Sequence, residues 1–372
     1  MTGPEPAAEP AVVTAAEAAP GAAPQALDVV AIGSPLVDVL ATAGEEEIAA
    51  AGLVRGSMAL VDLARAERIY AGMGPTTEVS GGSAANTVAG VAALGGRAGF
   101  VGTIADDELG RVFVHDIRAC GVEYEPSVAP ASGTGGRDGD GRSGDGAAEA
   151  LGTGRCLVLV SGDAERTMAT HLGAATTIRP EHVPEALVAR GRIAYLEGYL
   201  WDLPPAKEAM RRAVEVAHAH DGSVALSLSD PFCVERHQRE FLDLLLDDVD
   251  VLLGNEEEVT RLFGAPSLDR AVAAAEETGL LVAVTLGARG SVVLGAHGPV
   301  EVPATPVAEV VDTTGAGDLY AAGFLYGLTH GAGPEDCARL GALCAGEVIG
   351  HLGARPQHDL RALAGEAGLL GA

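Results

Sequence analysis

Short, continuously apolar runs alternate along the chain with segments that have a helical residue pattern. The first runs are 27–40 and 96–105, with the helical segment 83–95 between them. Further apolar runs follow at 192–200, 222–230, 249–255 and 280–287. Continuous apolar strands that alternate with helices predict an α/β fold, in which helices cover both faces of a mostly parallel sheet. Ligands of such sheets bind beyond the carboxyl ends of the strands, so residues directly after each strand are candidate functional residues.

The charge of the chain limits how it can hold phosphate. Its 372 residues include 24 basic and 52 acidic side chains, which give a formal net charge of −28. A chain this acidic is repelled by nucleic acid and by anionic membranes, so we expect neither as a partner. Lys207 is the single lysine, and no glycine precedes it, which excludes a P-loop. Any bound phosphate must therefore be held by backbone amides, helix N-termini, arginine or a metal ion.

Two segments of biased composition interrupt this pattern. Residues 1–26 are rich in Ala, Pro and Glu and predict a disordered tail, and the Gly/Asp-rich residues 130–154 predict a flexible insertion. We expect residues 27–372 to form one domain, because no interdomain linker separates its parts. The five cysteines form no CxxC pair, and no signal peptide or membrane-spanning run is evident, so we expect a cytoplasmic protein.

The segment 310–331 carries the strongest functional signal. Small residues at 313–317 lead into a helix that begins near Asp318. Free amides at a helix start bind anions together with the helix dipole, and glycines allow a phosphoryl group to approach the backbone. Asp318 places a carboxylate inside this anion site. It either caps the helix or acts as a base that deprotonates a hydroxyl attacking phosphorus.

Two motifs resemble those of the ribokinase-like (PfkB) family of small-molecule kinases. They are the string DTTGAGDLYAAGFLYGL, which starts at Asp312, and SGGSAANTVAGVAALGGRAGFVGTIADDELGR at 80–111. The resemblance extends from about residue 27 to the C-terminus, outside the tail and the insertion. It implies a ribokinase-like fold with a small β-sheet lid, built from about 36–62 and 120–172, and phosphoryl transfer from ATP to a small-molecule alcohol.

The resemblance assigns roles in phosphoryl transfer. It implies that Asp318 is the catalytic base, and that the amides of Gly315, Ala316 and Gly317 bind the transferring phosphoryl group. It also places Arg166 on the lid side, where its charge reaches the phosphates once the lid closes. The sequence alone is equally consistent with Arg166 as a solvated surface residue.

Nucleotide and metal contacts follow from the same resemblance. The segment 282–294 resembles the nucleotide strand of the family, although an ordinary hairpin would have the same pattern. ATP is therefore expected beside Thr285, Gly287 and Gly290, and beside Thr313 in the loop before the helix. The NxxE motif of the family corresponds to Asn255 and Glu258, whose spacing puts both on one helix face, where they would orient water bound to Mg²⁺. An acidic first turn that complements the helix dipole would explain the same residues.

The acceptor pocket is expected after the first strand. By resemblance, Asp38 accepts hydrogen bonds from two sugar hydroxyls, and Gly82 and Asn86 contact the same sugar. Ser83 is expected to cap the helix that carries Asn86 and to belong to the same acceptor-binding group. Phe232 resembles an aromatic residue that packs near a nucleobase, although a buried core phenylalanine would look the same in the sequence.

Local matches favour a nucleoside as the acceptor. The segments at 33–38, 164–175 and 226–235 resemble those of the family's adenosine kinases. We therefore expect transfer of the γ-phosphoryl group of MgATP to the 5′-hydroxyl of adenosine, by a monomer or a homodimer. The alternatives are another nucleoside, a free sugar such as ribose or fructose and, more remotely, a sensor without catalytic activity. A nicotinamide dehydrogenase is excluded, because no GxGxxG follows the first strand.

Overall fold

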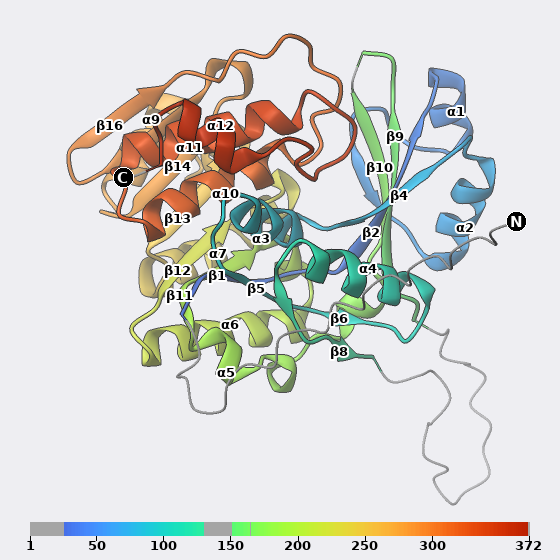
Figure 1. Ribbon diagram of the computed structural model, residues 1–372, viewed down its shortest axis with the longest axis horizontal. Coiled ribbons are helices and arrows are strands. Elements are labelled where there is room, and N and C mark those ends of the chain that lie inside the picture. The colour runs from blue at the N-terminus through green and yellow to red at the C-terminus, as the bar shows by residue number, and fades with distance from the viewer. Residues whose placement is uncertain (1–25, 130–150, 164, 371–372) are drawn as a thin grey trace, which may run out of the picture.

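The computed structural model describes residues 26–129, 151–163 and 165–370. A nine-stranded sheet forms the centre of this described part (Figure 1). In spatial order its strands are β16 (Gly298–Val302), β15 (Ser291–Gly295), β14 (Leu281–Thr285), β13 (Val251–Asn255), β12 (Ser223–Ser227), β11 (Gly191–Glu197), β1 (Leu27–Ile32), β5 (Ala98–Val101) and β7 (Glu123–Tyr124). The strands from β14 to β7 are parallel, whereas β15 and β16 add an antiparallel edge. The predicted fold class is confirmed.

Helices cover both faces of this sheet because its central strands are apolar on both sides. In β1, Val29 and Ala31 pack toward one face, and Val30 and Ile32 pack toward the other. The first face carries α3 (Ser83–Ala93), α4 (Glu108–Ala119), α10 (Ala316–Thr329), α11 (Pro334–Val348) and α12 (Leu360–Glu366). The second face carries α5 (Glu185–Val188), α6 (Pro204–Ala219), α7 (Pro231–Asp248), α8 (Glu256–Leu262) and α9 (Leu268–Glu276).

Helix α10 lies at the centre of the first face. Residues 319–327 are all buried, as expected for a helix that is apolar on every side. Small residues let its neighbours approach closely. A Cβ on Gly90 of α3 would lie 2.6 Å from the Cβ of Ala322, and one on Gly323 would lie 2.6 Å from the carbonyl oxygen of Leu340 in α11. This close packing brings the starts of α3 and α10 together.

A second sheet stands beside the large one (Figure 1). Among the described residues it has five strands, in the order β3 (Met58–Leu60), β10 (Arg166–His171), β9 (Gly154–Val160), β2 (Leu36–Thr42) and β4 (Thr77–Gly81). The helices α1 (Glu45–Ala50) and α2 (Leu63–Gly72) pack on one of its faces. We call this five-stranded sheet the lid sheet.

The composition of the lid sheet differs from the ranges predicted for it. Strand β4 lies outside those ranges. Its sequence, TEVSG, has no apolar run that would have predicted a strand, and it forms one by pairing with β2. Strand β7 lies inside them but extends the edge of the large sheet, next to β5. The short strands β6 (Thr103–Ile104) and β8 (Ser127–Val128) pair with each other.

Most of the predicted tail and insertion lies outside the described residues. Of 1–26 only Ala26 is described, and of 130–154 only 151–154.

The remaining short elements are the 3₁₀ helices η1 (Gly173–Thr177), η2 (Pro180–His182), η3 (Gly198–Asp202) and η4 (Gly287–Arg289). None of the described helices is long and apolar enough to cross a membrane.

The last residues of the predicted insertion belong to the fold, so its predicted C-terminal boundary is corrected. Gly154 is the first residue of β9, and Thr153 is buried. The hydroxyl of Thr153 accepts a hydrogen bond from the amide of Ala105 at 3.0 Å and donates one to Oδ1 of Asp107 at 2.7 Å. These bonds tie the start of β9 to the N-cap of α4, which the glycine-rich composition of the segment did not indicate.

Substitution of Thr153 by valine tests this boundary. Valine keeps the shape of the side chain but leaves the buried amide of Ala105 without an acceptor, which costs about 1–3 kcal/mol. We expect Thr153→Val to lower the free energy of unfolding by that amount in urea denaturation. Thr153→Ser keeps the hydroxyl and is the matched control. A valine variant as stable as the wild type would contradict the assignment of Thr153 to the folded core.

Candidate active site

The loop before α10 forms an anion site from backbone amides. Gly315 is the N-cap of the helix, and its φ of 78° lies in the left-handed region that favours glycine. The amides of Gly315, Gly317 and Asp318 donate to no acceptor among the described residues. The amide of Ala316 donates to the carbonyl oxygen of Thr313 at 3.3 Å. Free amides at the positive end of a helix dipole suit a phosphoryl group.

Asp312 holds this loop in place and is fully buried. Its Oδ1 accepts hydrogen bonds from the amide of Thr314 at 2.9 Å and from the hydroxyl of Thr314 at 2.6 Å. Its Oδ2 accepts from the amide of Gly353 at 2.9 Å, which ties the loop to the segment after α11. Sequence analysis gave Asp312 no role of its own, although Asp-x-Thr is a pattern of turns closed by a side chain.

The carboxylate of Asp318 lies between the starts of two helices. Its Oδ1 accepts a hydrogen bond from the hydroxyl of Ser83 at 2.7 Å, and its Oδ2 accepts one from Nδ2 of Asn86 at 2.9 Å. Gly315, not Asp318, caps α10, so capping does not explain Asp318. The N-cap of α3 is Gly82, so the capping role predicted for Ser83 was wrong. Ser83 is the first residue of α3, and its hydroxyl points to the carboxylate instead.

Opposing influences act on the pKa of Asp318. Burial raises it, whereas the hydrogen bonds from Asn86 and Ser83 and the charges of Arg166 and Arg355 lower it. The net direction is upward from the ordinary value of an aspartate. A raised pKa makes a carboxylate a stronger general base, provided that it remains ionised at the working pH.

The carboxylate of Asp38 lies against the glycine pair that precedes α3. A Cβ on Gly81 would lie 2.2 Å from it, and a Cβ on Gly82 would lie 2.2 Å from the carbonyl oxygen of Ser34. Asp38 is 5% exposed, and burial raises its pKa to about 7, an effect that is opposed most by the charge of Arg355. No described residue donates a hydrogen bond to Asp38, so its oxygens are available to hydroxyls of a ligand.

Asn86 has an unused acceptor atom beside these carboxylates. Its side chain is buried, and its Nδ2 donates to Asp318. Its Oδ1 is buried without a hydrogen-bond partner in the described structure. A buried acceptor that lacks a donor destabilises the fold, and such atoms are rare. A ligand hydroxyl bound here would satisfy it.

Strand register places Asp38 and Arg166 on the same side of the lid sheet. Asp38 in β2 is level with Cys156 in β9, and Arg166 in β10 is level with Val160 in β9. Because side chains alternate along each strand, every second residue shares this side. The other residues on it form an apolar cluster, which we call the lid face: Leu36, Leu40, Val79, Cys156, Val158, Val160 and Met168.

Asn255 and Glu258 form a capping box at the start of α8. Oδ1 of Asn255 accepts from the amide of Glu258 at 2.9 Å, and Oε2 of Glu258 accepts from the amide of Asn255 at 2.9 Å. Oε1 of Glu258 accepts from Nδ2 of Asn255 at 2.8 Å. Glu258 is buried, which raises its pKa to about 7. The two residues hydrogen-bond each other, and a contact with Mg²⁺ through water stays a prediction.

The other residues predicted to contact the nucleotide lie near this capping box. Thr285 ends β14, level with Asn255 in β13. Thr285, Gly287 and Asn255 contribute to the lining of a shallow hollow in the surface. Gly290 has a φ of 91°, and a Cβ there would lie 2.0 Å from a backbone oxygen of β16, so the turn requires glycine. Thr313 is exposed in the loop before α10.

Comparison with known proteins identifies the family. Residues 148–360 match the pfkB family of carbohydrate kinases. The chain belongs to the PfkB family. A PfkB kinase is a phosphotransferase with an alcohol acceptor, and the family implies ATP as the phosphoryl donor.

Solved and curated relatives of this PfkB kinase include enzymes named for sugars and for nucleosides. A probable sugar kinase from Rhizobium etli CFN 42 is 40% identical, covers 93% of this chain and 100% of its own, and has a TM-score of 0.84. An adenosine kinase from Sinorhizobium meliloti is 43% identical, covers 92% and 99%, and has a TM-score of 0.83. Adenosine kinase 1 of Arabidopsis thaliana is 29% identical over 275 residues, 68% of this chain and 72% of its own. The 5-dehydro-2-deoxygluconokinase of Geobacillus kaustophilus is 28% identical over 281 residues, 73% and 79% of the two chains.

Phe232 is the second residue of α7 and is 59% exposed, so the alternative of a buried core phenylalanine is wrong. Its contact with a nucleobase stays a prediction. The guanidinium of Arg261 lies 5.5 Å from the centre of its ring.

Arg166 makes no hydrogen bond or ion pair with another described residue, yet its charge acts on both Asp38 and Asp318.

Glu197 is a residue of this PfkB site that sequence analysis missed. It ends β11, is buried, and accepts hydrogen bonds from the amides of Ser34 at 3.4 Å and Ala84 at 2.9 Å. Burial raises its pKa to about 7. A Cβ on Gly33 would lie 2.6 Å from its Oε2, so glycine is needed beside it. An acid directly after the apolar run 193–196, at the carboxyl end of the strand, was the signal in the sequence.

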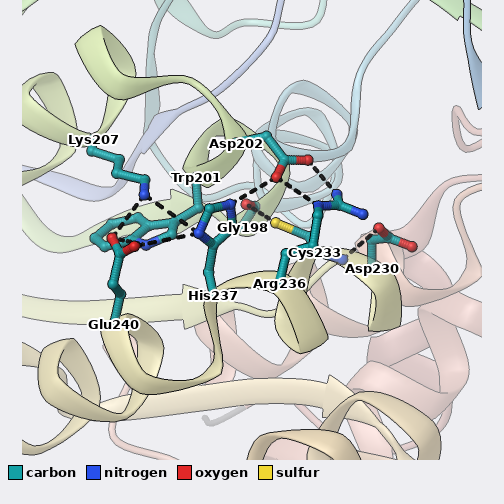
Figure 2. Close-up of polar contacts among 9 residues, drawn as sticks. All are labelled: Gly198, Trp201, Asp202, Lys207, Asp230, Cys233, Arg236, His237 and Glu240. Carbon is teal, nitrogen blue, oxygen red and sulfur yellow. Dashed lines mark hydrogen bonds and ion pairs between the residues drawn. The ribbon is translucent and has the colours of Figure 1, made fainter.

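A separate polar cluster joins η3 to α7 (Figure 2). Asp202, Cys233 and His237 have potential metal-binding atoms within 4.8 Å of one another. However, Arg236 donates to both oxygens of Asp202, and Nε2 of His237 lies 2.8 Å from Oδ1 of Asp202. Sγ of Cys233 lies 3.5 Å from the carbonyl oxygen of Gly198, and burial raises its pKa to about 12. The neutralised carboxylate and the protonated thiol fit a structural network rather than a metal centre.

The hydrogen bond from Ser83 to Asp318 can be tested through the pH dependence of the kinase reaction. Ser83→Ala removes a donor that stabilises the ionised carboxylate, so the pKa of Asp318 should rise further. The acidic limb of the pH profile of kcat/KM should therefore move to higher pH. Ser83→Thr retains the hydroxyl and should keep the wild-type limb. An alanine variant with an unshifted limb would show that Asp318 does not control this titration.

Proposed function

We propose that this PfkB kinase transfers the γ-phosphoryl group of ATP to the 5′-hydroxyl of adenosine. The lid face is the observation that carries the choice of acceptor. Beside the free oxygens of Asp38, that face carries apolar side chains from four strands, and those of Val79 and Met168 are only partly buried. A nucleobase is flat and largely apolar and would bury its area there, whereas a free sugar has hydroxyls that the lid face could not satisfy. The adenosine kinase from Sinorhizobium meliloti supports this choice.

Each residue of the site has a part in the proposed reaction. Asp38 and Oδ1 of Asn86 accept hydrogen bonds from ribose hydroxyls and orient the acceptor. Asp318 takes the proton of the attacking hydroxyl. The hydroxyl oxygen then bonds to the γ-phosphorus while the bond from that phosphorus to the leaving ADP oxygen breaks. The free amides at Gly315 and Gly317 stabilise the charge on the transferring group.

ATP supplies the phosphoryl group, and Mg²⁺ typically accompanies it in kinases of this kind. The part of the protein in this proposal is positioning and charge stabilisation. Arg166 stands on the lid sheet without a protein partner among the described residues, so its charge is available to a phosphate. Closure of the lid sheet over the acceptor would exclude water, which would otherwise compete for the phosphoryl group.

An assay of ADP formation against a panel of acceptors tests the proposed substrate. The panel holds adenosine, guanosine, cytidine, ribose, fructose and 5-dehydro-2-deoxygluconate, each with ATP and Mg²⁺. We expect the highest kcat/KM with adenosine and a value at least about a hundredfold lower with each free sugar. Preference for a sugar would overturn the nucleoside proposal and leave the kinase family in place.

Replacement of Asp318 tests the proposed base. Asp318→Asn keeps the size of the side chain but cannot accept the proton, so kcat should fall by about 10²–10⁴. Adenosine binding, measured by calorimetry, should change little, because Asp38 and Asn86 remain. The control is Asp336→Asn, which neutralises an exposed acid in α11 and should behave as the wild type. Turnover of Asp318→Asn at the wild-type rate would remove the base assignment.

A further inference from the structure

Arg355 connects two parts of the site that lie far apart in the sequence. It lies in the loop between α11 and α12. Its Nε donates to the carbonyl oxygen of Ser80 at 3.0 Å, and its Nη2 donates to the hydroxyl of Ser80 at 3.2 Å. Its Nη1 donates to the carbonyl oxygen of Ala85 at 2.6 Å. Ser80 belongs to β4 of the lid sheet and Ala85 to the first turn of α3, so one guanidinium spans the junction between them.

The loop that carries Arg355 is fixed to the anion site as well. The amide of Gly353 donates to Asp312 at 2.9 Å, and the amide of Val311 donates to the carbonyl oxygen of Ile349 at 2.8 Å. A chain of hydrogen bonds therefore runs from the loop before α10, through residues 349–355, to β4 and α3. The planar fork of arginine suits such a contact, because several donors point in fixed directions.

The other end of this loop is anchored by Glu347. The side chain of this residue of α11 is 3% exposed, and its Oε1 lies 3.1 Å from Nε2 of His351. The same oxygen accepts from the amides of Gln357 and His358, each at 2.9 Å. Because both ends of the loop are held in this way, the position of Arg355 is defined by the backbone around it.

The charge of Arg355 faces both carboxylates of the site, and Asp116 and Cys120 at the end of α4 face it as well. It is the strongest influence that opposes burial at Asp38, and it also lowers the pKa of Asp318. The other charged or titratable groups that face these two carboxylates are Arg166, Asp312, Cys156, Glu197, Tyr195 and Tyr199. Among them Arg166 is the other cation, and it has no hydrogen-bond partner in the described structure. Arg355 is therefore the positive charge that hydrogen bonds hold in place.

We propose that Arg355 is a positioning residue that fixes the junction of β4 and α3 to the anion loop and supplies the permanent counter-charge for Asp38 and Asp318. The inference rests on the proposed role of Asp318 as the base. The hydrogen bond from Arg355 to Ala85 fixes the position of the first turn of α3. Ser83 and Asn86, which donate hydrogen bonds to the proposed base, lie in that turn. Through Ser80, Arg355 sets the glycine pair against which Asp38 lies.

Two substitutions separate charge from geometry. Arg355→Gln removes the charge, so Asp38 and Asp318 should hold their protons to higher pH. The acidic limb of kcat/KM should then move up by about one pH unit or more, and activity lost at pH 7 should recover in part at pH 9. Arg355→Lys keeps the charge but cannot reach Ser80 and Ala85 together. The acidic limb of its kcat/KM profile should therefore stay at the wild-type pH, while KM for the acceptor rises at least about fivefold. Arg361→Gln, an exposed arginine in α12, is the matched control and should change neither value.

The outcomes distinguish this inference from the proposed function. An unshifted limb in Arg355→Gln, or a wild-type KM in Arg355→Lys, would overturn it, and the lysine variant keeps the test available if the glutamine variant does not fold. If the wild type phosphorylates no acceptor of the panel, the proposed function fails on its own. Amide hydrogen exchange then still tests the geometric part: Arg355→Gln should exchange faster than Arg361→Gln in 77–86 and 312–318. Equal exchange in the two variants would overturn it.

Discussion

The close packing of α3 against α10 is the contact on which the rest of the site depends. Gly90 and Ala322 meet where the helices cross, and any larger side chain at either position would separate them. Because the crossing is tight, the first turns of both helices reach the same point, and Asp318 receives donors from Ser83 and Asn86. The anion site and the position of the proposed base therefore result from core packing. Because cores are close-packed, a small loss of fit at this crossing would shift both.

The sequence predicted those parts of the site that depend on local pattern. Parallel strands, the helix start after 313–317 and the helix that carries Ser83 and Asn86 all follow from short motifs, whereas the hydrogen bonds from these two residues to Asp318 were not predicted. What was missed depends on contacts between distant segments. Glu197 and Arg355 act on backbone groups of α3 and β4, and their partners cannot be read from neighbouring residues. Strand β4 is a similar case, since pairing with β2 rather than propensity makes it a strand.

The same limit applies to details of single residues. Phe232 was open to two interpretations, and its exposed ring at the start of α7, beside Arg261, excludes a core residue, while its contact with a nucleobase stays a prediction. Ser83 has the residue type of an N-cap, but the left-handed φ of Gly82 gives that role to the glycine and frees the hydroxyl for Asp318. At Ser83 the local pattern was real, and the tertiary structure uses the hydroxyl for a different contact.

The buried acidic groups lower the stability of the folded protein in the ionised state that the proposed reaction requires. Asp38 and Glu197 have pKa values near 7, well above those of an unfolded chain, so the native state binds protons that the unfolded state has released. The contribution of these groups to the free energy of unfolding is therefore largest at low pH and is lost as pH rises from about 4 to about 7. The proposed chemistry needs the ionised forms, which the fold tolerates least. Arg355 reduces this conflict, because a fixed positive charge lowers the cost of ionising Asp38 and Asp318.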